Sequence, residues 1–110
     1  MRFDVRLTEE ATENVREIRD WLADRSIDGA FNWLDAFEDA RRRLSESAGS
    51  FGRAPEDDWF EEELKQHMFQ TQHGNRYRIV YLIRGSTVYI MAVRGFGEGN
   101  IPTGALRPPE

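Results

Sequence analysis

Two apolar runs in the C-terminal half dominate the hydrophobic pattern of this chain of 110 residues. Residues 76–84 and 87–95 are rich in β-branched and aromatic residues, and only Gly85-Ser86 separates them. Such a break predicts a tight hairpin, because glycine readily adopts the positive φ that a type II′ turn needs at its first central position. Neither run alternates cleanly between apolar and polar residues. We therefore expect both strands to be covered on two faces and to lie centrally in a sheet.

The N-terminal half combines a short alternating segment with helical periodicity. Residues 2–7 alternate between apolar and polar side chains, which predicts a half-buried strand. Thr8 is a good N-cap for a helix that ends near Asp24, and Asp28 can cap a second helix that Gly49 stops. The apolar stripe of the first helix consists of Ala11, Val15, Ile18 and Leu22. The short connection predicts an antiparallel helical hairpin.

The remaining segments complete a simple element order. Glycine and proline mark residues 50–60 as a loop, and a further strand is expected from about Glu63 to Gln72. We therefore predict an α+β fold in the order β-α-α-β-β-β, with a small antiparallel sheet and the helical hairpin on one face. The second face is expected to be less well covered, which leaves it available to a partner. Residues 1–97 would form this domain, and residues 98–110 an irregular, mobile tail.

Composition excludes several classes of protein and site. The chain has no cysteine, so it has neither disulfides nor a thiol-based zinc site. It has no long apolar run, which argues against a signal peptide and a membrane span and favours a cytoplasmic location. His67 and His73 lack a third ligand at a typical spacing, so we expect no metal and no cofactor.

Charge is distributed unevenly along the chain. The net charge is −5, but residues 1–64 carry −9 and residues 65–110 carry +4. Guanidinium groups on a buried sheet need carboxylates, phosphates or a partner protein, and this sheet has arginines at positions 76, 78, 84 and 94. Two interpretations stay open. The arginines can form a local basic cleft, or the acidic helices can neutralise them internally.

Five segments, in this order, resemble the RelE/ParE superfamily of bacterial toxins, and in particular its plasmid-stabilisation branch. The resemblance covers roughly residues 2–97. The segments that carry it are the β-α-α opening with Glu17–Leu22 and Trp33–Glu38, the Ala54-Pro55-Glu56 loop, Glu63–Phe69, Tyr77–Tyr81 and Val88–Gly95.

The resemblance implies a toxin of a type II toxin–antitoxin module. An antitoxin would hold it inactive by laying an extended segment or a helix across the sheet and the helical hairpin, in a hetero-oligomer. One branch of the superfamily cleaves mRNA in the ribosome, and the other poisons DNA gyrase. Basic residues on the sheet of the nuclease branch can stabilise charge that develops on the scissile phosphate.

Carried over to this chain, the nuclease site has three candidate residues. Arg78 lies where that branch has a phosphate-contacting arginine, Lys65 lies near its lysine-bearing strand, and Arg94 is the candidate for its second arginine. The tyrosine that some members carry in a C-terminal helix is missing, because residues 97–110 contain no tyrosine. This departure favours a gyrase-directed toxin. The alternatives are a ribosome-dependent mRNA endonuclease and an inactive relative that only binds the antitoxin.

The register of the hairpin decides whether two of these residues share a site. With a regular two-residue turn, Arg78 pairs with Val93 and Arg94 pairs with Tyr77, which puts the two arginines on opposite faces. A bulge near Gly95 would reverse this arrangement.

Exposed aromatic residues are candidates for partner contacts. Trp21 and Trp33 lie on facing helices, either in the core or at the rim of an antitoxin groove. Trp59 and Phe60 lie in a polar loop, where they either anchor the loop on the sheet or contact the antitoxin. The acidic run over residues 56–63 is expected to be a solvated loop or a dock for a basic antitoxin arm.

Overall fold

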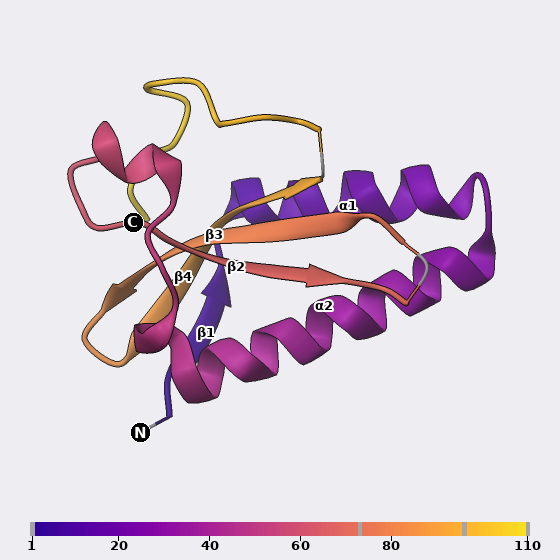
Figure 1. Cartoon of the computed structure of the whole chain (residues 1–110), viewed down its shortest axis with the longest axis horizontal. Coiled ribbons are helices and arrows are strands. Elements are labelled where there is room, and N and C mark those ends of the chain that lie inside the picture. The colour runs from indigo at the N-terminus through magenta and orange to yellow at the C-terminus, as the bar shows by residue number, and fades with distance from the viewer. Residues whose placement is uncertain (1, 73, 96, 110) are drawn as a thin grey trace.

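The structure, a computed structural model, describes residues 2–72, 74–95 and 97–109. A four-stranded sheet packs against a helical hairpin, and irregular segments cross the other face of the sheet (Figure 1). The elements are β1 (Asp4–Leu7), α1 (Glu9–Ala23), α2 (Ile27–Ser47), the 3₁₀ turns η1 (Ala48–Ser50) and η2 (Pro55–Asp58), β2 (Lys65–Gln70), β3 (Arg76–Arg84) and β4 (Thr87–Gly95). The predicted α+β fold is confirmed. The predicted turn residue His73 lies outside the described residues.

Side-chain caps fix the starts of both helices. The Thr8 hydroxyl accepts a hydrogen bond from the Ala11 amide, as predicted for α1. The cap of α2 was expected at Asp28, but it is Ser26, whose hydroxyl accepts from the amide of Gly29. Ser26 has the extended backbone of an N-cap, while Asp28 lies in the first turn, where its negative charge favours the helix dipole.

The strand order across the sheet is β1-β4-β3-β2, so β3 and β4 are the central strands, as predicted. The sheet was expected to be antiparallel, but β1 runs parallel to β4 and only the other pairs are antiparallel, which makes the sheet mixed. The hairpin between β3 and β4 has the expected two-residue turn. It pairs Arg84 with Thr87, and Gly85 has a φ of 59°.

A β-bulge in β4 changes the register of the hairpin halfway along it. Tyr81 pairs with Ile90, but the preceding residue Val80 pairs with Ala92, so Met91 is the extra residue. Helix α1 stabilises this irregularity, because the Asn14 side-chain carbonyl accepts a hydrogen bond from the Val93 amide at 3.1 Å.

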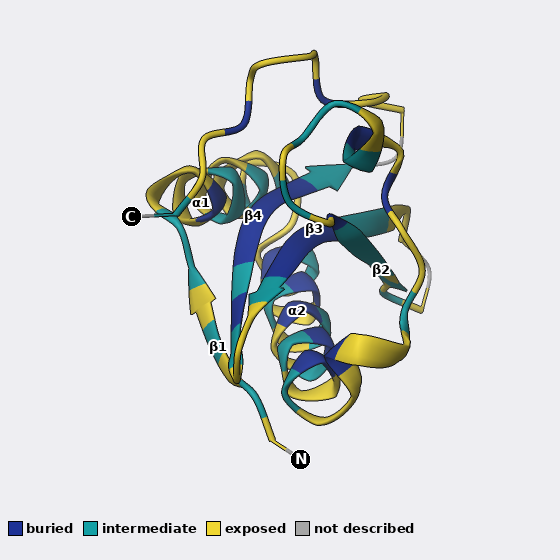
Figure 2. Ribbon diagram, turned by 90° about the vertical axis from the view of Figure 1, so that its left-hand side faces the viewer, coloured by how far each residue is buried: buried dark blue, intermediate teal, exposed yellow. Residues whose placement is uncertain are grey.

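Both faces of the sheet are covered, and the middle residues of β3 and β4 are buried (Figure 2). The helix-side core is built on Ala11, Trp33, Phe37, Ala40, Leu44, Ala48, Ile79, Tyr81, Val88, Ile90 and Val93. The second core contains Ala54, Leu64, Val80, Leu82, Met91, Ala92, Ile101 and Leu106. The second face was expected to be less well covered than the first, and irregular segments cover it in place of helices. The loop before β2 and the segment after β4 supply apolar side chains that bury it.

Candidate functional site

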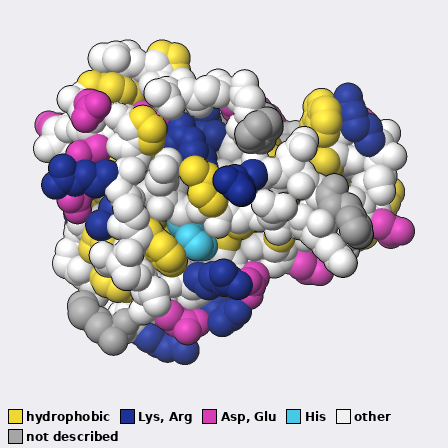
Figure 3. All heavy atoms as spheres, viewed as in Figure 1, with side chains coloured by type: hydrophobic (Ala, Val, Ile, Leu, Met, Phe, Trp, Pro, Cys, Tyr) yellow, Lys and Arg dark blue, Asp and Glu magenta, His cyan; other side chains and the backbone are white. Residues whose placement is uncertain are grey.

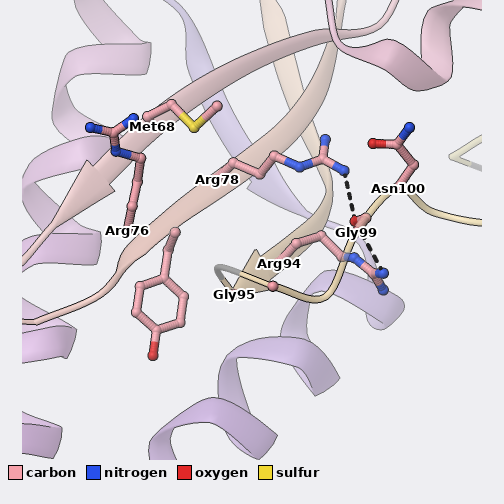
Figure 4. A pocket seen from close by; sticks show the side chains of 9 residues that line it. Met68, Arg76, Arg78, Arg94, Gly95, Gly99 and Asn100 are labelled. Carbon is pink, nitrogen blue, oxygen red and sulfur yellow. Dashed lines mark hydrogen bonds between the residues drawn. The ribbon is translucent and has the colours of Figure 1, made fainter.

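Three arginines surround a small cavity on the second face of the sheet (Figure 4). The cavity has a volume of about 250 Å³. Arg76 and Arg78 come from β3 and Arg94 comes from β4. The other lining residues are Met68, Tyr77, Gly95, Gly97, Gly99 and Asn100.

The bulge in β4 brings Arg78 and Arg94 to the same face. The structure pairs them directly across the hairpin, so their side chains project to one side of the sheet. The opposite-face arrangement expected of an unbulged hairpin is wrong. The reversal comes from a bulge, as the alternative required, but it lies at Met91 instead of near Gly95.

Arg78 is already occupied by a buried carboxylate. Its two terminal nitrogens donate to the two carboxylate oxygens of Glu56 at 2.8 and 2.6 Å, and the Glu56 side chain is fully buried. Gln66 Oε1 and the carbonyl of Gly99 accept further hydrogen bonds from Arg78 at 3.4 Å. Only 12% of the Arg78 side chain is exposed. A planar bidentate ion pair of this kind offsets the free-energy cost of desolvating both charges.

Glu56 is ionised despite its burial. Burial opposes the charged form, but the hydrogen bonds from Arg78 and from the Ile101 amide outweigh it and hold the pKa of Glu56 below its usual value. The site therefore contains an ion pair in which each charge satisfies the other.

Arg94 makes its contacts to the chain that follows β4. One of its terminal nitrogens donates to the carbonyls of Glu98 and Gly99 at 3.0 and 3.4 Å. The Glu98 carboxylate lies 3.5 Å from the other terminal nitrogen. Arg94 Nε is buried and has no hydrogen-bond partner among the described residues. Arg94 is therefore less completely neutralised than Arg78.

Lys65 lies on the other face of the sheet. It pairs with Tyr81, whose ring belongs to the helix-side core, and its ammonium group donates to the carbonyl of Phe51 at 2.9 Å. The structure therefore separates Lys65 from the two arginines. A catalytic role for any of the three stays a prediction.

The acidic loop before β2 was expected to be solvated or to dock an antitoxin arm. For Glu56 the expectation of solvation is wrong. Glu56 is fully buried, Asp57 Oδ1 accepts from the Leu64 amide at 2.8 Å, and Glu62 pairs with Arg84 on the surface. The acidic partners of Arg78 and Arg84 thus come from this loop, and that of Arg94 from the segment after β4, and not from the helices. Glu56 is the residue that sequence reasoning missed. The signal was an arginine inside an apolar strand, which requires a carboxylate from somewhere in the chain.

The tryptophans of the helical hairpin occupy different environments. Trp33 is 1% exposed and packs against the rings of Phe37, Phe69 and Tyr77. Trp21 is 52% exposed, and the Arg25 guanidinium lies over its ring at 3.6 Å from the ring centre. A contact of either residue with a partner stays a prediction.

A groove of about 680 Å³ lies between the tip of the helical hairpin and the turn that joins β2 to β3. Its aromatic wall consists of Trp21, Trp33 and Tyr77. Trp33 Nε1 is buried and has no acceptor among the described residues. The remaining lining residues are Leu22, Gly29, Asn32, Ala36, Gln70, Thr71, Gln72, Gly74 and Asn75. Apolar rings edged by amides and hydroxyls suit a peptide, which offers both apolar side chains and backbone carbonyls.

Trp59 and Phe60 pack partly buried against the second core, with their ring centres 6.1 Å apart. Their position fits the predicted role of anchoring the loop on the sheet.

The molecular surface shows basic and hydrophobic side chains next to one another in the middle of one face (Figure 3).

The described residues contain no group of three or more potential metal ligands. His67 stacks on Phe51 on the helix side, and burial lowers the pKa of its imidazole. Within the described parts of the chain, no helix is long and apolar enough to cross a membrane.

The family model described as ParE toxin of type II toxin-antitoxin system, parDE, matches residues 5–95. The chain belongs to this ParE toxin family. The match spans every helix and strand described above except the first residue of β1, and it confirms the RelE/ParE resemblance and its ParE-like assignment. The protein is thus a toxin-family component of a type II toxin–antitoxin module. No curated protein sequence is significantly similar to the chain.

A solved structure, the chromosomal ParDE TA system from P. aeruginosa, has a chain of the same fold. The TM-score is 0.61 and the sequence identity is 13%, with 84% of this chain and 95% of that chain covered. The ParE fold is therefore kept although most side chains differ.

Proposed function

We propose that this ParE-family protein is a cytoplasmic toxin that poisons DNA gyrase through protein–protein contact and that a cognate antitoxin neutralises it. The observation that supports contact over RNA cleavage is the state of Arg78. Its guanidinium is bound in two-pronged fashion by the fully buried Glu56, so it has little positive charge to offer a phosphate. Lys65, on the opposite face, cannot join it at one scissile bond.

The antitoxin is proposed to dock at the groove beside the helical hairpin. Trp21 provides an exposed aromatic surface at the rim, and the aromatic wall includes Trp33, whose Nε1 has no acceptor among the described residues. Large aromatic residues in desolvated pockets dominate the binding energy of many protein interfaces. Trp59 and Phe60 remain candidates for a second contact.

The test is expression of the chain from a tightly regulated promoter, with and without the small protein encoded by the neighbouring upstream reading frame. Pulse labelling of DNA and protein synthesis follows the arrest. We expect DNA synthesis to fall first, a DNA-damage response, and rescue by the neighbouring protein. In vitro, gyrase mixed with the purified chain should cleave supercoiled plasmid into linear DNA. The same chain mixed first with antitoxin is the matched control.

A ribosome-dependent mRNA endonuclease is the second candidate. The observation that favours it is the shared face of Arg78 and Arg94, with Arg76 at the same cavity. Two or three guanidinium groups around one phosphate would stabilise developing negative charge. An early fall in protein synthesis, with cleaved mRNA in translating ribosomes and unaffected gyrase, would establish this activity instead. Healthy growth with folded protein present would indicate a relative that only binds the antitoxin.

A further inference from the structure

The segment after β4, residues 97–109, lies across the second face of the sheet and is called the tail below. It contains no helix or strand, and most of its residues are exposed. Two of its side chains are exceptions: Ile101 and Leu106 are 5% and 6% exposed and join the second core. The tail therefore adheres to the sheet through two apolar anchors.

Polar contacts fasten the tail at its start. Glu56 Oε2 accepts a hydrogen bond from the Ile101 amide at 2.7 Å, beside its pair with Arg78. The carbonyl of Gly99 accepts from both Arg78 and Arg94 at 3.4 Å (Figure 4). One buried carboxylate thus joins the loop before β2, the central strand β3 and the tail.

The tail occupies the two arginines with its own oxygens. The carbonyls of Glu98 and Gly99 and the Glu98 carboxylate take up the terminal nitrogens of Arg94. The side chains of Arg78 and Arg94 are only 12% and 22% exposed, whereas Arg53 on the surface is 71% exposed. A ligand that takes over these hydrogen bonds has to displace the tail first.

We propose that the tail is a strap that closes over the Arg78–Arg94 pair and the second core, and that Glu56 is the residue that fastens it. Release of the strap uncovers the two guanidinium groups together with an apolar strip. This regulation of access goes beyond the proposed function and holds whichever target the toxin has. The strap can open without global unfolding because the helix-side core contains none of its residues.

Amide hydrogen exchange on the full chain tests the strap, with Ile101 as the reporter. Glu56→Gln and, separately, Leu106→Ala should raise exchange of the tail amides by about tenfold or more and leave β3 and β4 protected. Glu63→Gln is the matched control, because Glu63 lies in the same loop, is half exposed, and pairs with Arg53 and Lys65, neither of which belongs to the tail. It should leave the tail unchanged.

A second measurement follows the side chains that the strap covers. Phenylglyoxal labels exposed arginines, and mass spectrometry locates the label. In Leu106→Ala the labelling of Arg78 and Arg94 should rise several-fold, while that of the exposed Arg53 stays constant. If Glu56→Gln unfolds the whole chain, Leu106→Ala alone decides.

Three results would overturn the proposal. The first is rapid exchange of the Ile101 amide in the unaltered protein. The second is an equal loss of protection in the tail and in β3 and β4 of Leu106→Ala, because this would make the tail part of one cooperative unit. The third is unchanged labelling of Arg78 and Arg94 in a Leu106→Ala variant that has lost tail protection.

Discussion

The two faces of the sheet are stabilised in different ways. The helix-side face buries aromatic and aliphatic side chains from two long helices, with Trp33 and Phe37 stacked at 5.6 Å between ring centres. The second face is covered by irregular segments, and a charged cluster around Glu56 holds them in place. The comparison teaches that the helix-side face is stabilised by the apolar area that it buries, and the second face by a few specific polar contacts. Changes to the second face should therefore separate stability from function most clearly.

Arg78→Ala should have the largest effect on stability. It leaves Glu56 buried and ionised without its partner, which costs on the order of 3–5 kcal/mol of unfolding free energy. Arg84→Ala is the control, because the Arg84–Glu62 pair lies on the surface and is worth about 1 kcal/mol or less. Denaturant unfolding of both variants measures the difference. Equal, small losses would contradict the buried-pair account.

Leucine-to-alanine changes compare the two cores directly. Leu44→Ala on the helix side should cost about 2–5 kcal/mol, because the surrounding helix and sheet cannot collapse into the cavity. Leu106→Ala should fall at or below the lower end of that range, because the tail around it can relax. Thermal or denaturant unfolding tests the order. A larger loss for Leu106→Ala would show that the tail is as rigidly packed as the helices.

Acid should weaken the second face before the first. Burial opposes ionisation of Glu56, but the hydrogen bonds from Arg78 and Ile101 lower its pKa below the usual value of 4.5. A lowered carboxyl pKa adds stability that is fully present above pH 4.5 and is lost as the pH falls through the lower folded-state pKa. Unfolding free energies measured from pH 6 to pH 2 should show this loss in the unaltered chain. Glu56→Gln should lack that contribution, and an identical pH profile would contradict the assignment.

Trp21→Ala should have the smallest effect on stability and a large effect on binding. The side chain is half exposed, so the unfolding free energy should change by about 0.5 kcal/mol or less. If the groove receives the antitoxin, the affinity should fall by about tenfold or more, as expected for an aromatic hot spot. Isothermal titration with the purified antitoxin measures this. Phe31→Ala, another exposed aromatic that does not line the groove, is the matched control.

The backbone of the helix-side face could be predicted from the sequence because local signals are strong there. Thr8 as a cap, the apolar stripes and the Gly85-Ser86 turn each predict structure within a few residues. The start of α2 was misplaced by competition between two good caps, Ser26 and Asp28. The extended backbone of Ser26 and the hydrogen bond that its hydroxyl accepts from the Gly29 amide distinguish them.

The second face could not be predicted because its determinants are distant in the sequence. Glu56 and Ile101 lie 45 residues apart, and neither has a local pattern that points to the other. The sequence pattern of β4 does not reveal the bulge at Met91, because the residues around it are all apolar. This bulge nevertheless places Arg78 and Arg94 on the same face. The residues of this site are brought together by strand register and by long-range contacts, so they can be recognised only in the folded chain.

The central claim is that the charge of Arg78 serves the fold and not the chemistry of the toxin. The most direct test is the double variant Glu56→Gln/Arg78→Gln, which removes both charges and keeps amides that can hydrogen-bond to each other and to Ile101. Its toxicity in vivo is compared with that of the unaltered chain, after unfolding and antitoxin binding show that it is folded. We predict that the folded double variant stays toxic and still arrests DNA synthesis. A folded variant that binds antitoxin but is no longer toxic would contradict the account and make Arg78 a functional residue.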